Sequence, residues 1–405
     1  MRVLTFGWDF PPVKNGGLGV ACHGLTQELI NAGVEVIFVL PREQPVNGPI
    51  RFIFADVQPV KLYEVRASLT PYKSSQSFVE FVDSAGKRVR LSRRKIEEVY
   101  QYAEAARKIA EVEEFDLIHA HDWSAYLAGV VAKAVSGKPL ILHVHATAFD
   151  QAAGEHVDPD VYAIEHHAFH AADSVVAISK YTKNLIAEKY GVPEEKIEIV
   201  HNGIADAEYK VLPPMLSALK AEGKKIVVYH GRITIQKGVD YFVRAARRVV
   251  DVDPNVMFVI SGWGDMERQI MGLVGSLGLS KNVLFAGALW DDDRDRLYEC
   301  ADLVVMPSVS EPFGLVPLEA LQHGTPVLIS KQSGVSEVLK HALKVDFWDT
   351  DEMSNKILAA LRYGTMHNQL ATEGKRELLS LTWRKAAEKI IALYRKLLDQ
   401  IRRTR

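Results

Sequence analysis

The sequence predicts an α/β protein with two doubly wound, Rossmann-like domains. Its 405 residues, at about 150 per domain, correspond to two or three domains. Short apolar segments alternate with amphipathic segments along most of the chain, the pattern of parallel sheets covered by helices. The pattern breaks once, between Asn202 and Lys225, where Pro213 and Pro214 stand together. We therefore expect domains at 1–205 and 206–382.

The first domain opens with a predicted βαβ unit. A strand over Val3–Trp8 precedes a helix over Ala21–Ala32 and a second strand over Val34–Leu40. Alternating residues in Ile50–Val60 and Ser77–Leu91 predict an inserted antiparallel patch. Further strands are expected at Asp116–Ala120, Pro139–Val144, Ser174–Ile178 and Lys196–Val200.

The second domain repeats this order of elements. Its strands are expected at Ile226–His230, Val256–Ser261, Val283–Ala286, Leu303–Met306 and Pro326–Ser330. Ligands of such sheets bind beyond the carboxyl ends of the strands, so a cleft between the domains is the expected site.

Composition excludes several classes of protein. The chain is 48% hydrophobic and 25% charged with a net charge of −2, so it can bury a core and lacks the basic excess of a nucleic-acid binder. Cys22 and Cys300 have no metal-ligand spacing and cannot form a disulfide framework, which favours a reducing, cytoplasmic setting. We expect neither a signal peptide nor a membrane-spanning segment, because no charged leader or 18-residue apolar run occurs.

Two glycine-containing loops are candidate anion sites. In the first, Lys14 precedes Gly16 and Gly17 at the start of a predicted helix, where backbone amides could hold an anion. An ordinary tight turn is the alternative. In the second, Arg232 follows a strand and Lys237 opens the next helix, so two cations and a helix N-terminus could hold a diphosphate. The alternative there is a solvated loop.

A third candidate follows the predicted strand Leu303–Met306. Glu311 precedes Glu319 by eight residues, slightly more than two helical turns, so both carboxylates are expected along one side. They could accept sugar hydroxyls, and the free amides of Phe313, Gly314 and Leu315 could meet a sugar or phosphate. A capping role for Glu311 and a surface position for Glu319 remain the alternative.

Histidines end two strands of the first domain. His119 and His121 precede Asp122, and His143 and His145 end the next strand; we expect each pair to divide between the two faces of the sheet. His166 and His170 have the i,i+4 spacing of a metal-binding pair. No third ligand accompanies that pair, so core or surface histidines are expected and a metal site is not.

In this order the motifs resemble the retaining GT-B glycosyltransferases of the glycogen-synthase and sucrose-synthase-like superfamily, the glycosyl transferases group 1. The resemblance spans nearly the whole chain. It is carried by Lys14–Leu18, His119–Trp123, His201–Gly203, Gly231–Arg232 with Lys237–Gly238, and Glu311–Glu319.

The resemblance implies two Rossmann-like domains facing a deep cleft, with a C-terminal helix at 383–403 crossing back to the first. It implies transfer of a glucosyl or related hexosyl unit from ADP- or UDP-glucose to an acceptor hydroxyl, with retention of configuration. An α-glucan acceptor is expected, with a small-molecule or lipid-linked acceptor as the alternative; an epimerase or a non-catalytic sensor is disfavoured.

The resemblance also implies roles for individual residues. Arg232 and Lys237 would neutralise the leaving diphosphate without a metal or other cofactor. Glu311 would contact the transferred sugar, Glu319 the donor ribose, and the loop Phe313–Leu315 the sugar or phosphate. His145 would lie near the sugar C6 hydroxyl, Asp122 would line the acceptor side, and Lys14, Gly16 and Gly17 would help bind the donor.

Two basic clusters could touch an anionic membrane. They are Lys87 to Lys95 and the tail with Arg402, Arg403 and Arg405. A solvated face is the favoured interpretation, since neither cluster accompanies a clear apolar face.

Overall fold

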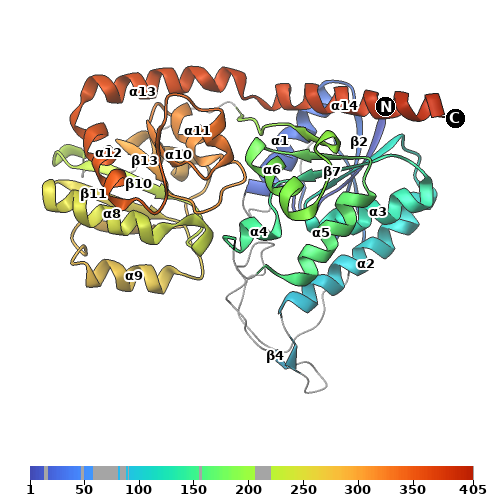
Figure 1. Cartoon of the computed structure of the whole chain (residues 1–405), viewed down its shortest axis with the longest axis horizontal. Helices are drawn as coiled ribbons and strands as arrows, with labels where there is room; N and C mark the ends of the chain where they lie inside the picture. Colours follow the sequence, from blue (N-terminus) through green and yellow to red (C-terminus); the bar gives the residue numbers. More distant parts are fainter. Residues whose placement is uncertain are drawn as a thin grey trace. The chain divides into compact units, whose positions relative to one another are not determined.

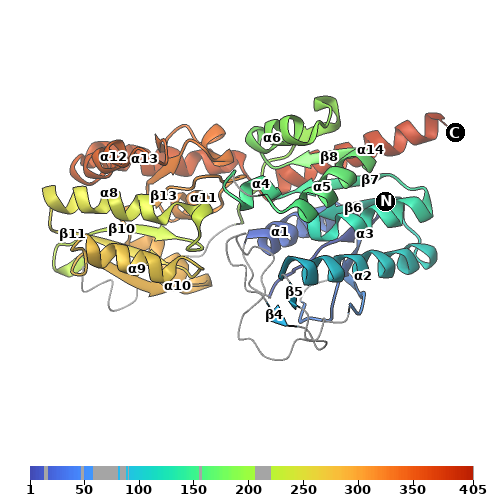
Figure 2. The ribbon, with the colours of Figure 1, turned by 60° about the horizontal axis from the view of Figure 1, so that its bottom comes forward.

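The computed structural model describes residues 1–12, 17–46, 50–57, 81–82, 88–89, 91–154, 157–205 and 220–404. Contacts between residues divide the chain into two units. The N-terminal unit comprises Met1–Gly203 with Thr382–Arg405, and the C-terminal unit comprises Ile204–Leu381. Figures 1 and 2 show a sheet and its surrounding helices in each unit.

The N-terminal unit contains a seven-stranded parallel sheet of order β3-β2-β1-β6-β7-β8-β9. Its strands are β1 (Arg2–Phe6), β2 (Glu35–Leu40), β3 (Arg51–Phe54), β6 (Leu117–His121), β7 (Leu140–Val144), β8 (Ser174–Ala177) and β9 (Ile197–Ile199). The strands at the two edges of the sheet, β3 and β9, are short. The central strands β1, β6 and β7 are buried on both faces. Such a sheet must be covered by helices on both sides.

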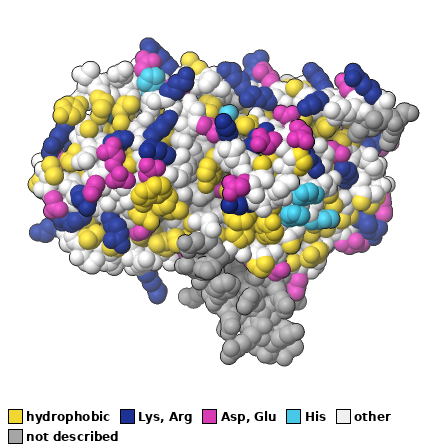
Figure 3. All heavy atoms as spheres, in the orientation of Figure 1, with side chains coloured by type: hydrophobic (Ala, Val, Ile, Leu, Met, Phe, Trp, Pro, Cys, Tyr) yellow, Lys and Arg dark blue, Asp and Glu magenta, His cyan; other side chains and the backbone are white. Residues whose placement is uncertain are grey.

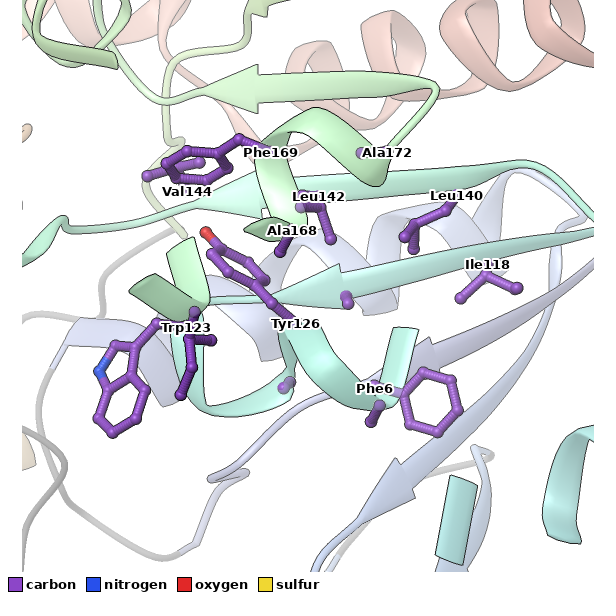
Figure 4. Packing of buried hydrophobic residues seen from close by; sticks show 14 of the residues in the cluster. Phe6, Ile118, Trp123, Tyr126, Leu140, Leu142, Val144, Ala168, Phe169 and Ala172 are labelled. Carbon is purple, nitrogen blue, oxygen red and sulfur yellow. The ribbon is translucent and has the colours of Figure 1, made fainter. Parts of the chain in front are cut away.

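Alternating strand residues separate the two faces. Leu4 and Ile118 face α2 (Leu91–Val112), α3 (Trp123–Ser136), α5 (Pro159–Ala171) and α6 (Lys180–Tyr190). Figure 4 shows part of this packing, with Tyr126 of α3 and Phe169 of α5 against the sheet. Val3 and Leu117 face the opposite side, where α1 (Gly17–Asn31) and α14 (Trp383–Thr404) cover the sheet. The helix at the C-terminal end of the chain thus completes the core of the N-terminal unit.

The C-terminal unit contains a six-stranded parallel sheet of order β12-β11-β10-β13-β14-β15. Its strands are β10 (Lys225–His230), β11 (Val256–Ser261), β12 (Val283–Gly287), β13 (Leu303–Met306), β14 (Val327–Ser330) and β15 (Leu343–Val345). One core forms where the sheet meets α8 (Val239–Val252), α9 (Glu267–Ser276) and α12 (Thr350–Arg362). The other α-helices among the described residues of this unit are α10 (Asp291–Cys300), α11 (Val316–Gln322) and α13 (Gly364–Glu377), of which α10 and α11 contact the sheet.

The predicted antiparallel insertion is only partly observed. Residues 51–54 do not belong to it, because β3 adds in parallel to the edge of the main sheet beside β2. The two short strands β4 (Phe81–Val82) and β5 (Arg88–Val89) do pair antiparallel, and the residues between β3 and β4 lie largely outside the described part.

The strand β15 was not expected from sequence. Its three residues, Leu343–Val345, are too few to show a strand pattern, and pairing with β14 establishes them as a strand. Among the described helices, none combines the length and the apolar character needed to cross a bilayer.

Candidate active site

Each sheet reverses its strand order at one place, and loops from both directions meet there. In the C-terminal unit the reversal lies between β10 and β13, and in the N-terminal unit between β1 and β6. A parallel α/β sheet binds its ligands at such a place, beyond the carboxyl ends of the strands. The residues that follow β10, β13 and β6 are therefore candidates for ligand binding.

The loop after β10 carries both expected cations. Arg232 follows Gly231, and its backbone carbonyl accepts a hydrogen bond of 2.5 Å from the Tyr229 hydroxyl. Lys237 ends a short 3-10 turn, and Gly238 then leads into α8 with a φ of +64°. A Cβ atom on Gly238 would lie 2.2 Å from the carbonyl oxygen of Pro307. Only glycine therefore lets this loop approach the loop after β13 so closely.

This close approach brings Lys237 to Glu311. The Lys237 ammonium lies 2.5 Å from a carboxylate oxygen of Glu311, and the Ser308 hydroxyl donates to the same oxygen at 3.1 Å. The two charged side chains are only 20% and 11% exposed, so water screens their attraction weakly. One carboxylate and one ammonium are thus fixed at the reversal point.

The segment from Glu311 to Leu315, just before α11, is held by backbone contacts with the loop after β14. Glu311 pairs with Ser333 in a parallel bridge, and the Val335 amide donates to the Phe313 carbonyl at 2.7 Å. Gly314 has a φ of +104°, which disfavours any residue with a side chain. Among the described residues, none accepts a hydrogen bond from the backbone N–H of Gly314 or Leu315. These two donors are available to a bound anion or hydroxyl.

Glu319 has different partners from Glu311. One of its carboxylate oxygens lies 3.2 Å from an Arg294 nitrogen, and the other accepts a hydrogen bond of 2.9 Å from the Tyr298 hydroxyl. Glu311 lies in a β-bridge before the N-cap residue Leu315 and is not part of the helix that carries Glu319, so the helical spacing expected of the two acids is not observed. The alternative interpretation is also wrong, since Leu315 occupies the N-cap and Glu319 is only 15% exposed.

In the N-terminal unit, Asp122 fixes the loop that carries His145. Asp122 follows β6 with a φ of +63°, and one of its carboxylate oxygens accepts hydrogen bonds from the amides of His145 and Ala146 at 2.9 and 3.2 Å. Two residues after Ala146, the backbone amide of Ala148 donates to the buried carboxyl of Glu165. Two buried acids thus set the path of the chain after β7.

The four histidines of β6 and β7 form one buried stack, which corrects the expectation that each pair divides between the faces. Residues two apart in a strand share a face, and His119, His121, His143 and His145 all lie on the face covered by α1 and α14. His119 bonds to the Tyr394 hydroxyl of α14 at 2.6 Å, and His121 Nδ1 lies 3.0 Å from His145 Nε2. Burial lowers the pKa of His145 to about 3, so its ring is neutral at physiological pH.

The remaining predicted residues add few described contacts to the site. Lys14 and Gly16 lie outside the described residues, and Gly17 is the exposed first residue of α1. In the basic cluster, Lys95 points inward, with its ammonium 5.3 Å from the centre of the Trp8 ring and 4.7 Å from that of Trp123. Lys95 is therefore not a surface cation available to a membrane.

The i,i+4 histidine pair lies on the surface of α5. Figure 3 shows histidine side chains gathered over this helix, whose exposed histidines are His166, His167 and His170. His170 Nδ1 lies 2.8 Å from the backbone carbonyl oxygen of His166, so one of its ring nitrogens is already engaged.

Sequence reasoning missed several partners of these residues. Arg294 and Tyr298 come from α10, and Ser308 and Glu165 stand alone in the sequence without a motif. The only sequence signal was the position of Ser308 two residues after a buried strand, at the edge where ligands bind.

Comparison with known proteins identifies the family. The family model "Glycosyl transferases group 1" matches residues 217–377, and "Glycosyltransferase Family 4" matches residues 15–208. A glycosyltransferase of Methanocaldococcus jannaschii is 30% identical over 357 residues, which are 84% of this chain and 83% of the relative. The chain belongs to the group 1 glycosyltransferases.

Other known proteins are also similar to the chain. A glycogen synthase of Mycobacterium tuberculosis is 26% identical over 351 residues, covering 84% of this chain and 80% of the relative. Sucrose-phosphate synthase of Thermosynechococcus elongatus has the same fold, with a TM-score of 0.77, 21% identity and coverage of 98% and 99%. Anabaena HepE, solved with UDP-glucose, has a TM-score of 0.72, 18% identity and coverage of 98% and 100%. These similarities confirm the predicted GT-B fold and the assignment of this group 1 glycosyltransferase as a transferase.

Proposed function

We propose that this glycosyltransferase moves a glucosyl unit from ADP- or UDP-glucose to a hydroxyl of an α-glucan, with retention of configuration. The observation that carries the proposal is the Lys237–Glu311 pair at the reversal point of the C-terminal sheet. Similarity to a glycogen synthase over 84% of the chain favours a glucan acceptor, and the HepE complex with UDP-glucose favours a nucleotide-sugar donor.

The C-terminal unit supplies charges suited to a leaving diphosphate. Arg232 and Lys237 stand on one loop, and the N–H groups of Gly314 and Leu315 are available from the other. Fixed donors and cations stabilise developing negative charge without reorganisation, which is the largest contribution to many enzymatic rates. We propose that these groups do so without a metal ion or another cofactor.

Glu311 suits contact with the transferred sugar. Its carboxylate is held by Lys237 and Ser308, so it is positioned before a sugar binds and could accept hydrogen bonds from sugar hydroxyls. We assign Glu319 to the donor ribose, with Arg294 and Tyr298 fixing its orientation.

We propose a front-face reaction. The bond between the sugar C1 and the diphosphate oxygen breaks while the acceptor oxygen bonds to C1 from the same face. The acceptor proton passes to the departing diphosphate oxygen, so no protein carboxylate forms a covalent intermediate. His145 would lie beside the sugar as a neutral ring, since its pKa is about 3, and Asp122 would define the acceptor side by holding the His145 loop.

The test is nucleotide release from a panel of ADP-, UDP- and GDP-sugars, with and without glycogen, maltooligosaccharides and simple sugars. We expect release from one glucose donor that rises only with a glucan, and a product with the donor's anomeric configuration by NMR. Nucleotide release that depends on another acceptor would agree with a transferase but would contradict the proposed glucan acceptor. Isomerised donor without acceptor consumption would instead identify an epimerase.

The metal-free mechanism has its own control. Activity should not rise when Mg²⁺ or Mn²⁺ is added to the enzyme after dialysis against buffer free of these ions. A rate that depends on either ion would overturn the assignment of the diphosphate charge to Arg232 and Lys237.

A further inference from the structure

A thiol and two imidazoles converge inside the N-terminal unit. Cys22 comes from α1, His121 ends β6 and His145 follows β7. One potential ligand atom from each residue lies within 4.8 Å of the others. All three side chains are buried, with residue exposures of 0%, 1% and 8%.

The stack around this group contains buried ring nitrogens without hydrogen-bond partners among the described residues. They are His119 Nε2, both nitrogens of His143, and His145 Nδ1. Most buried polar atoms in proteins have a hydrogen-bond partner, because leaving one without a partner is costly. One of these atoms belongs to a member of the converging group, His145, and the others belong to the rings stacked beside it.

We propose that Cys22, His121 and His145 form a binding site for a zinc ion or a similar divalent transition-metal ion. One thiolate with two imidazoles is a ligand set that zinc prefers, and three protein ligands leave a fourth position open. Carboxylate-preferring ions such as Mg²⁺ are disfavoured by the same ligand set.

The spacing of the imidazoles fits this assignment. His121 Nδ1 and His145 Nε2 are 3.0 Å apart. Two nitrogens bound to one tetrahedral zinc at about 2.0–2.1 Å stand about 3.3 Å apart. The ring nitrogens thus need to move by only a few tenths of an ångström, and the hydrogen bond between them is exchanged for two bonds to the metal.

Metal binding also has a definite proton balance. Burial raises the pKa of the Cys22 thiol, so the free side chain is protonated. A bound zinc ion replaces that proton, and one proton leaves to solvent for each ion bound. The site is distinct from the diphosphate charges, which belong to Arg232 and Lys237 of the C-terminal unit.

The remaining histidines of the stack would support the ligands. His119 is fixed by the Tyr394 hydroxyl at 2.6 Å, and its ring centre lies 4.3 Å from that of His121. Removal of such outer partners weakens metal binding by about 10–100-fold in known sites. Loss of a direct ligand should cost at least as much.

The test uses Co²⁺ as a spectroscopic substitute for zinc, with the full chain, reduced and freed of metal by dialysis against a chelator. We expect a near-ultraviolet thiolate-to-cobalt absorption band that saturates at one ion per chain and disappears when Zn²⁺ is added. Cys22→Ser should abolish the band and weaken zinc binding by more than about tenfold in competition with a chromophoric chelator.

The chain offers a matched control. Cys300 is the second cysteine; it is also buried and lies in the C-terminal unit, so Cys300→Ser should leave the band and the zinc affinity unchanged. Circular dichroism and thermal unfolding show whether Cys22→Ser remains folded, and His121→Asn provides a second ligand variant. Loss of the band in Cys300→Ser would overturn the assignment, and so would a wild-type protein that binds no Co²⁺. Binding without a thiolate band would also overturn it and would move the ion to the group His119, His121 and His143.

Discussion

The ammonium of Lys237 lies 2.5 Å from the carboxylate of Glu311, although the two residues follow different strands and are separated by 74 positions. Each limits the movement of the other, so both side chains are held in place before a ligand binds. Catalytic groups that are held in place before substrate binds need little reorganisation during the reaction.

If Lys237 stabilises the leaving diphosphate as we propose, Lys237→Met should lower the rate of nucleotide release by about 10²–10³-fold, because the charge is lost while the chain length is kept. Glu311→Gln should also be impaired. The double variant should lose less than the product of the two factors, since residues in contact are not additive. Lys331→Met is the control, because Lys331 pairs with Asp346 at the surface of the same unit. A full product of the two losses would show that Lys237 and Glu311 act independently.

Gly238→Ala should separate the two loops. Its φ of +64° is unfavourable for alanine, and the new methyl group would lie 2.2 Å from the Pro307 carbonyl oxygen. We expect a loss of about 1–3 kcal/mol in the free energy of unfolding, measured in urea, together with a loss of activity. Gly278→Ala isolates the backbone cost, because Gly278 has a φ of +67° and nothing within 4 Å of the added carbon. Equal losses in both variants would contradict the close packing.

Asp122→Ala should release the loop after β7, because the amides of His145 and Ala146 lose their acceptor. The combined cost should be about 2–4 kcal/mol in stability, with a further loss of transfer rate. Asp122→Asn keeps an acceptor oxygen and tolerates the positive φ, so it should retain most of the stability. If asparagine were as damaging as alanine in urea unfolding, the acceptor role of Asp122 would be wrong.

Glu319→Gln should raise the KM for the donor by about tenfold with a smaller effect on kcat, because it weakens binding that is already present in the ground state. A donor whose ribose lacks the 2′-hydroxyl should bind the wild type less well than the normal donor. If the Glu319 carboxylate accepts a hydrogen bond from that hydroxyl, removing the hydroxyl should weaken donor binding to Glu319→Gln much less than it weakens binding to the wild type. An equal weakening in both proteins would show that Glu319 does not contact the ribose hydroxyl.

Lys95 provides a prediction for pH. Burial lowers the pKa of Lys95 from 10.5 to about 8, so the unfolded chain binds more protons than the folded chain between these values. The free energy of unfolding should therefore rise with pH through this window, by up to about 3 kcal/mol at 1.36 kcal/mol per unit. Lys95→Met should lack this rise and be more stable at pH 7. Parallel pH profiles for wild type and variant, from urea unfolding between pH 7 and 10.5, would contradict the prediction.

The sequence predicts the strands of the main sheets well, because buried parallel strands are continuous apolar segments. The strands Val256–Ser261 and Leu303–Met306 agree at every residue with β11 and β13. The strands at the edges of the sheets were predicted less well. β3 was assigned to the wrong partner because alternation in Arg51–Phe54 does not say which strand it joins, and β15 is too short to show a pattern.

The candidate site was predicted as separate motifs, and its contacts were not. The position of Lys237 after β10 and of Glu311 after β13 follows from the rule about strand ends. Their direct pairing depends on the closeness allowed by Gly238, which the sequence does not reveal. The partners of Glu319 lie on α10, whose helical pattern gives no sign of which side chains point toward α11.

The return of α14 to the N-terminal unit has a consequence for synthesis on the ribosome. The face of the sheet formed by Val3 and Leu117 is complete only when Trp383 and the residues after it have been made. All of Ile204–Leu381 is translated first, and at about 5–20 residues per second this takes on the order of 10–40 s. During that interval the nascent N-terminal half carries an apolar face that α1 covers only in part. The half of the protein that is made first is therefore the last to finish folding, because its core is complete only after α14 has left the exit tunnel.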